Sequence, residues 1–338
     1  MKIDYLDKFQ GTLIGVAIGD TLGHPFEGML RSEIINRVKN VENVEAFILK
    51  NKNLFNTYTD DTQLTLHTAE ALVQGNGFNI DNFISEYIKW LEDPPIGPGY
   101  GCIYSIRKLK YGVSREEAAS NSGGNGAAMR ISPIGLFYCK DLMSLKEAAI
   151  QSSLITHTHS AALAGAVVIA RAIAYLIDKN PKKGFSIDDF FEVILSSISN
   201  STDKIWEEFV NVLKKVKANL DLIPIEPGLI KFSQAGVKPP YFIEEYIGQS
   251  FVHPYTLSTV ACTIFVFLKK LNSFKECIFE LATVGGDTDS VGAIGGSLAG
   301  TYFGASNIPP ELIKLVKNYK NILKIANDLY GKFEERYI

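Results

Sequence analysis

The sequence has few cysteines, and none of them is paired. Its 338 residues contain four cysteines that lie far apart, and no histidine is spaced to complete a zinc knuckle with them. This pattern argues against a disulfide framework and is typical of reduced, mostly buried thiols in a cytosolic chain. The four residues are Cys102, Cys139, Cys262 and Cys277.

The sequence also lacks an excess of positive charge and a membrane-spanning run. Lys and Arg total 34 against 37 Asp and Glu, and the formal net charge of −3 disfavours nucleic acid and anionic membranes as partners. Of two apolar runs, 255–268 is too short to cross a bilayer and 160–177 carries Arg171 at its middle. The start, MKIDYLDKFQ, lacks the apolar core of a secretory signal, so we expect a cytoplasmic protein with no membrane partner.

Signals for β-strands are scarce. Segment 44–49 is the only stretch that predicts a short strand. Helical periodicity dominates elsewhere, as in 6–17, 64–73 and 83–91, where apolar residues fall on one face. Further helices are expected at about 145–155, 160–178, 187–199, 203–219, 256–270, 273–284, 290–303 and 309–329, of which 160–178 and 256–270 are apolar on more than one side, as in central helices.

Breaks rich in Pro and Gly are short. They occur at 93–101, 180–184 and 224–228, and the composition does not change across any of them. The sequence has no repeat and no low-complexity tract, and its length allows a large buried core. It therefore predicts an all-α fold in a single compact multi-helical domain over residues 1–338.

Two acidic turns stand at the start of helical segments. YTDDT and GGDTDS each carry two carboxylates, whereas a helix cap needs one, although capping is the structural alternative for either turn alone. No Lys or Arg lies within four residues of either pair, so the ionised carboxylates repel unless a cation lies between them. Carboxylate and hydroxyl oxygens suit Mg²⁺, Mn²⁺ or Ca²⁺ better than Zn²⁺. The candidate ligands are Thr59, Asp60, Asp61, Asp287, Asp289 and Ser290.

Glycines surround the second acidic turn. Gly285 and Gly286 allow the backbone to turn sharply enough to aim the carboxylates at one point. Gly292, Gly296 and Gly300 follow at four-residue intervals, which places them in one stripe on a helix. We expect this stripe to serve close packing, which makes the helix a rigid mount for its N-terminal carboxylates.

A glycine-rich turn at 123–126 is a candidate cradle for a diphosphate. It precedes an apolar, helix-compatible segment, but its spacing matches neither a Walker site nor a Rossmann site. Tyr100, at the end of a loop rich in Pro and Gly, offers a face on which a purine can stack, although the loop can equally be only a rigid connection. The turn consists of Gly123, Gly124, Asn125 and Gly126.

Two histidines precede the apolar segment 160–178. A helix cap or a core position is the ordinary role of His157 and of His159. Their i, i+2 spacing does not place both rings on one helical face, which argues against a paired zinc site.

Taken in this order, the motifs resemble those of the ADP-ribosylglycohydrolase family. The resemblance begins at GTLIGVAIGDTLGHPFEG and continues through TDDT, GNGAAMR, a TH-x-x-x-A helix start and GGDTDS, over about residues 11–303. It implies an all-helical fold with two divalent cations, Mg²⁺ or Mn²⁺, in a central cleft. The ligands that it implies are Thr59, Asp60, Asp61, Asp287, Asp289 and Ser290.

The resemblance also implies an activity. It implies a metal-dependent hydrolase that cleaves the glycosidic bond between ADP-ribose and an acceptor on a protein or small molecule, releasing ADP-ribose. The implied catalytic residues are Asp60, Asp61 and Glu27, with Asp61 or Glu27 accepting the proton of the attacking water. Residues 123–126 would border the diphosphate, and His157 would line the ribose pocket.

Part of the chain departs from the family pattern. Family members commonly have a Pro just after the first histidine, whereas this chain continues with Thr158 and His159, so no family role carries over to His159. Segment 220–255 matches no family motif and is a candidate for selecting the acceptor. The acceptor itself is open among arginine, serine, an acyl group, a nucleic-acid base and a small guanidine.

Two other functions are alternatives to hydrolysis. A catalytically silent module that only binds ADP-ribose or a related nucleotide would keep the cleft, but it could lose the metal ligands, and this chain retains all of them. A prenyl-diphosphate enzyme is also helical and depends on Mg²⁺, but it needs a DDxxD motif. Here Asp61 is followed by Thr62, Gln63 and Leu64, which argues against that class.

Overall fold

Helices account for the regular secondary structure of the described chain. The computed structural model describes residues 3–199 and 201–338, and within them it has isolated bridges but no β-strand. The predicted all-α fold is therefore confirmed. The α-helices are α1 (Tyr5–Gly23), α2 (Arg31–Val38), α3 (Val44–Lys50), α4 (Asp60–Gly75), α5 (Ile80–Trp90), α6 (Tyr100–Lys110), α7 (Arg115–Ala118), α8 (Ser132–Phe137), α9 (Leu142–Ser153), α10 (Ser160–Leu176), α11 (Ile187–Ser196), α12 (Lys204–Asn219), α13 (Ile225–Phe232), α14 (Thr256–Lys269), α15 (Phe274–Leu281), α16 (Thr288–Phe303), α17 (Pro310–Leu315) and α18 (Tyr319–Tyr337). The short 3₁₀ helices are η1 (His24–Phe26), η2 (Val41–Asn43), η3 (Lys52–Leu54), η4 (Asn125–Ala127), η5 (Glu244–Tyr246) and η6 (Ala305–Asn307).

Glycines hold α1 against α16 at backbone contact. A Cβ added to Gly15 would lie 3.0 Å from the carbonyl carbon of Gly296, and one added to Gly296 would lie 2.7 Å from that of Gly15. Such separations leave no room for a side chain on either helix. The predicted stripe on α16 thus packs against a matching stripe on α1, which consists of Gly11, Gly15, Gly19 and Gly23.

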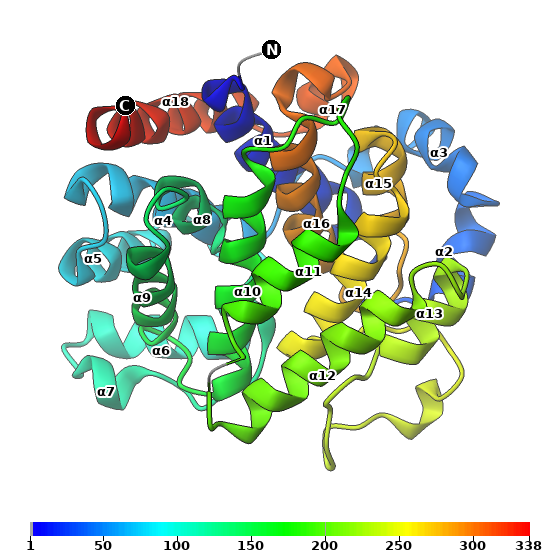
Figure 1. Cartoon of the computed structure of the whole chain (residues 1–338), viewed down its shortest axis with the longest axis horizontal. Helices are drawn as coiled ribbons and strands as arrows, with labels where there is room; N and C mark the ends of the chain where they lie inside the picture. Colours follow the sequence, from blue (N-terminus) through cyan, green and yellow to red (C-terminus); the bar gives the residue numbers. More distant parts are fainter. Residues whose placement is uncertain (1–2, 200) are drawn as a thin grey trace.

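The other helices wrap this pair. Helices α10 and α14 are apolar and almost wholly buried, as expected for central helices. Helix α18 covers the N-terminal half of α1, where the ring centroids of Phe9 and Phe333 lie 5.2 Å apart. In Figure 1, α5, α6 and α7 lie on one side of α10, and α2 and α3 lie on the opposite side of the molecule.

Three predictions of local structure are wrong. Segment 44–49 is helix α3 rather than a strand, because Val44 and Ile48 are buried at the four-residue spacing of a helix face. Segment 224–228 opens α13, since proline is tolerated in the first helical turn, where N–H groups have no intrahelical partner. The helix expected at 309–329 is two helices, α17 and α18, separated by a turn in which Asn318 has a left-handed φ of 56°.

The predicted state of the thiols agrees with the structure. All four cysteines are free and buried. Among the described residues, no helix is both long and apolar enough to cross a bilayer.

Candidate functional site

Both acidic turns border one large pocket. Its volume is about 1020 Å³, and it lies where α4, α6 and α16 begin. Three helix N-termini therefore face the same space, which favours anionic groups there. The sequence-predicted residues that line it are Glu27, Asp60, Asp61, Tyr100, Gly123, Gly124, Asn125, Gly126, His157, Asp287, Asp289 and Ser290.

Thr59 is the one predicted site residue that does not line the pocket. It is fully buried at the N-cap of α4, and its hydroxyl donates a 3.0 Å hydrogen bond to Asp20. Asp20, from α1, also accepts hydrogen bonds from the backbone N–H groups of Thr59 and Thr62, each at 3.0 Å, and from the Thr62 hydroxyl at 2.6 Å. Sequence analysis missed the Asp20 carboxylate, which holds the TDDT turn in place through these hydrogen bonds.

The second acidic turn depends on two glycines with positive φ. Gly285 and Gly286 have φ angles of 84° and 76°. A Cβ on Gly285 would lie 2.5 Å from both Arg31 N and Ser250 O, so no side chain fits there. The turn brings Asp287 beside the glycine-rich turn, where Asn125 Nδ2 donates a 2.6 Å hydrogen bond to Asp287 Oδ2.

The aspartates of the two turns are close enough to perturb one another. Burial and the neighbouring Asp20 raise the pKa of Asp60 to about 8. Burial and the charge of Asp289 raise the pKa of Asp61 well above the ordinary range, and burial and the charge of Asp287 do the same to the pKa of Asp289. Within the described residues, no Lys or Arg forms an ion pair with any of these aspartates.

Two buried carboxylate oxygens in the pocket stand out for their hydrogen bonding. Asp60 Oδ2 and Asp61 Oδ1 lack a partner among residues 3–199 and 201–338, although each residue is only 3% exposed. A buried polar atom without a partner is costly. Together with the uncompensated negative charge, these oxygens make a donor set suited to divalent cations.

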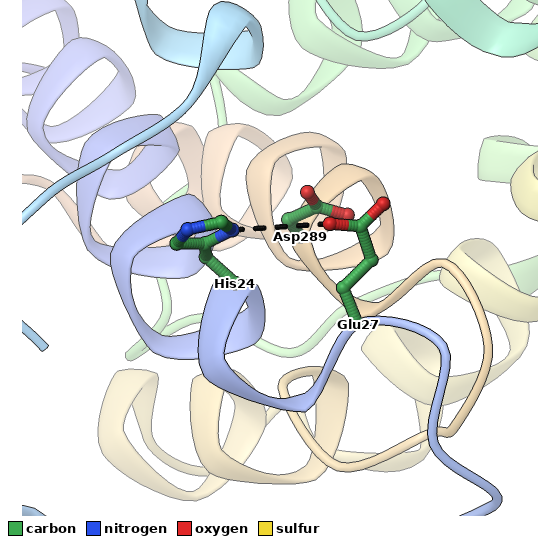
Figure 2. Close-up of side chains that lie close together, drawn as sticks. All are labelled: His24, Glu27 and Asp289. Atoms are coloured by element: carbon green, nitrogen blue, oxygen red, sulfur yellow. Dashed lines mark ion pairs between the residues drawn. The ribbon is translucent and has the colours of Figure 1, made fainter. Parts of the chain in front are cut away.

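Glu27 approaches the second acidic turn from η1. Glu27, His24 and Asp289 each offer a ligand atom, and the three atoms lie within 4.8 Å of one another. Figure 2 shows the three side chains converging at the end of α1 and the start of α16. Burial and the charge of Asp287 raise the pKa of Glu27 above its usual value. Sequence analysis did not single out His24 as part of the site.

The glycine-rich turn packs tightly against the pocket wall. A Cβ on Gly123 would lie 2.6 Å from a ring carbon of Tyr255, and one on Gly126 would lie 2.9 Å from His157 Cε1. The N–H of Asn125 already donates to Pro254 O at 3.1 Å, and the N–H of Gly124 to Ser122 Oγ at 3.2 Å. Two N–H groups of the turn therefore already donate hydrogen bonds within the protein, and these bonds stabilise the conformation of the turn.

The two histidines of the THTH segment have different surroundings. His157 is buried, with its Nδ1 2.7 Å from Thr156 Oγ1, and burial and the positive charge of Arg130 lower its pKa to about 3. His157 is therefore neutral at pH 7. His159 caps α10, where its Nδ1 accepts a 3.1 Å hydrogen bond from Ala161 N.

Exposed aromatic and polar residues form the rim. Tyr100 is 73% exposed and stacks on Tyr104, with ring centroids 5.2 Å apart. The pocket wall also includes segments 236–239 and 253–255 together with Tyr241. These belong to the segment that carries no recognisable motif, so residue types and spacing gave no signal for them.

Comparisons with known proteins agree on one family. The family profile described as ADP-ribosylglycohydrolase matches residues 1–338. The chain is 26% identical to the ADP-ribosylhydrolase ARH3 of Xenopus tropicalis, over 98% of this chain and 96% of that protein. It is 26% identical to the ADP-ribosyl-[dinitrogen reductase] glycohydrolase of Rhodospirillum rubrum, over 90% and 88% of the two chains.

Two further similar proteins match nearly the whole chain. An uncharacterised protein of Archaeoglobus fulgidus is 28% identical over 96% of both chains. A solved ADP-ribosylglycohydrolase-related protein complex has the same fold, with a TM-score of 0.69 and 22% identity over 97% of this chain and 99% of the other. Because the family profile spans the whole sequence, the chain belongs to the ADP-ribosylglycohydrolase family.

Proposed function

We propose that this protein is a metal-dependent hydrolase that cleaves the glycosidic bond between ADP-ribose and an acceptor. The observation that carries this proposal is the meeting of both acidic turns, with two unpartnered buried oxygens, in one pocket of about 1020 Å³. Such a volume suits a ligand of nucleotide size.

The residues present fit two divalent cations, Mg²⁺ or Mn²⁺. All the donors are hard oxygens, and they come from turns held rigidly by Asp20 on one side and by Gly285 and Gly286 on the other. When bound, the cations supply positive charge that orients sugar hydroxyls and lowers the pKa of a water molecule. The residues that would hold them are Thr59, Asp60, Asp61, Asp287, Asp289 and Ser290.

Glu27 is the better placed of the two candidate proton acceptors. Its side chain is half exposed at the pocket, within reach of Asp289. Asp61, by contrast, is buried, and its Oδ2 is 3.4 Å from the Thr59 hydroxyl. A carboxylate that accepts the proton of the attacking water must reach the substrate, and Glu27 meets this condition.

The remaining pocket residues would bind ADP-ribose. The glycine-rich turn at 123–126 and the N-terminus of α6 border the space where a diphosphate gains from helix dipoles. Neutral His157 would line the ribose pocket, and Tyr100 offers an exposed ring for the base. The unmatched wall at 236–241 would contact the acceptor, a protein side chain or a small molecule.

The test is a panel of ADP-ribosylated acceptors assayed with Mg²⁺, with Mn²⁺ and with chelator. The proposal predicts release of ADP-ribose from at least one of the arginine-, serine- and acyl-linked substrates, abolished by chelator. Tight calorimetric binding of ADP-ribose without turnover on any substrate would instead favour a silent ADP-ribose-binding module.

A further inference from the structure

His24 is held beside the acidic turn of α16 by the packing of α1. Gly23, the last residue of α1, touches the start of α16 so closely that an added Cβ would lie 2.7 Å from Asp289 Cα. The next residue, His24, therefore begins at a fixed distance from Asp289. It opens the short helix η1, which also ends next to Glu27.

The Nδ1 atom of His24 has no hydrogen-bond partner among the described residues. Although 30% of the side chain is exposed, the Nδ1 atom itself is buried, and no donor or acceptor among the described residues bonds to it. Its nearest carboxylate oxygen, Glu27 Oε2, lies 3.8 Å away, beyond hydrogen-bond distance. Figure 2 shows the ring turned toward Glu27 and Asp289.

These separations fit ligands of one cation. Two donors bound at about 2.1 Å lie about 3.0 Å apart when adjacent and about 4.2 Å apart when opposite each other. The 3.8 Å between His24 Nδ1 and Glu27 Oε2 falls in this range, and one ligand atom each of His24, Glu27 and Asp289 lies within 4.8 Å of the other two. A second, independent sign of a ligand is close by: Asp289 is the first charge that acts on Asp61, and Asp61 Oδ1 is buried without a hydrogen-bond partner among the described residues.

A simple ion pair explains the arrangement less well. An exposed pair at this distance contributes little to stability, since both side chains remain partly in water. It also gives no reason for the burial of Nδ1 or for the presence of Asp289 in the same group.

We propose that His24 Nδ1 is a nitrogen ligand of the cation held by Asp289 and Glu27. This inference rests on the proposed function, since it assumes that the acidic turns bind cations. Both Mn²⁺ and Mg²⁺ bind carboxylate oxygens, but Mn²⁺, as a transition-metal ion, accepts an imidazole nitrogen more readily than Mg²⁺ does. His24 therefore makes this half of the centre prefer Mn²⁺ over Mg²⁺, and Glu27 keeps one carboxylate oxygen for the water proton.

The test is pulsed electron paramagnetic resonance of the full chain loaded with Mn²⁺. The wild-type protein should show a ¹⁴N coupling of a directly bound nitrogen, and His24→Asn and His24→Ala should lose it. His253→Gln is the matched control, because His253 lines the same pocket but is outside the group formed by His24, Glu27 and Asp289. That variant should keep the coupling.

The outcomes separate this inference from the proposed function. Bound Mn²⁺ without a ¹⁴N coupling, or with a coupling that survives in His24→Ala, would overturn the role of His24 and leave the cation centre intact. No binding of Mn²⁺ or Mg²⁺ by the wild-type protein would overturn both.

A titration of the two metals gives a second readout. His24→Asn places an amide near the position of Nδ1 and should lower the affinity for Mn²⁺ about tenfold or more, while the affinity for Mg²⁺ changes by less than about threefold. Equal losses for both metals would show that His24 acts on the fold of the site rather than as a ligand.

Discussion

The carboxylate of Asp20 accepts hydrogen bonds from both the backbone N–H and the hydroxyl of Thr59, each at 3.0 Å. Asp20 is completely buried near the end of α1, and Thr59 caps α4. Hydrogen bonds to Asp20 thus hold the first acidic turn against α1. Helix α1 also packs on α16, and α16 carries the second acidic turn. One pair of helices therefore sets the distance between the two halves of the site.

The first prediction concerns Asp20. In Asp20→Asn, an amide N–H group would face the donors of Thr59 and Thr62, so the turn must shift. We expect the affinity for divalent cations to fall at least about tenfold and the free energy of unfolding to fall by about 1–3 kcal/mol. Calorimetry and urea unfolding measure the two effects. Asp178→Asn, which removes an exposed ion pair with Lys140, should leave cation affinity unchanged.

The second prediction concerns the close glycine contact between α1 and α16. A Cβ on Gly19 would enter the backbone of Gly292 and lie 3.1 Å from Ala293 N, so Gly19→Ala should lower the free energy of unfolding by about 1–3 kcal/mol or more. Gly331, on α18, has nothing within 4 Å of its added Cβ. Gly331→Ala should therefore be neutral or slightly stabilising. Similar unfolding curves for the two variants would contradict the claim that glycine is required where α1 meets α16.

The third prediction concerns His157, whose pKa burial and Arg130 lower to about 3. Between about pH 6.5 and pH 3, the unfolded chain binds a proton at this histidine and the folded chain does not, so this contribution to stability falls as the pH falls. By nuclear magnetic resonance, the ring signals of His157 should not titrate between pH 8 and pH 5. A midpoint near pH 6.5 in the folded protein would contradict its burial as a neutral ring.

The fourth prediction separates proton transfer from binding. Glu27→Gln removes the proposed proton acceptor and should lower kcat about 10²- to 10⁴-fold, while ADP-ribose still binds with an affinity within a few fold of the wild type. Steady-state rates and calorimetry with ADP-ribose test the two parts. An undiminished kcat would assign the proton transfer to Asp61 instead.

The long helices and the meeting of the two acidic turns in one pocket were both predicted from the sequence. Extended helical periodicity identified α10 and α14, and paired carboxylates without nearby Lys or Arg indicated bound cations. The family resemblance implied that both turns share one cleft, and both line the same pocket. Segment 44–49 was misassigned because a run of six residues fits the period of a strand as easily as that of a helix. Only the surrounding core decides between the two.

Other parts of the site had no signal in the sequence. The four hydrogen-bond donors around Asp20 come from residues about forty positions away, so its role depends on how α1 meets α4. The position of His24 likewise follows from the glycine contact between α1 and α16. The wall at 236–241 is irregular and carries no motif, so only the folded chain reveals that it borders the pocket.

The most direct test of the cation centre is the number of Mn²⁺ ions bound per chain in the wild type, in Asp61→Asn and in Asp289→Asn, measured together with ADP-ribose release. We predict two ions and activity in the wild type, and weakened binding with loss of activity in both variants, because the two turns hold the ions jointly. Unchanged activity of both variants in the presence of chelator would contradict the account.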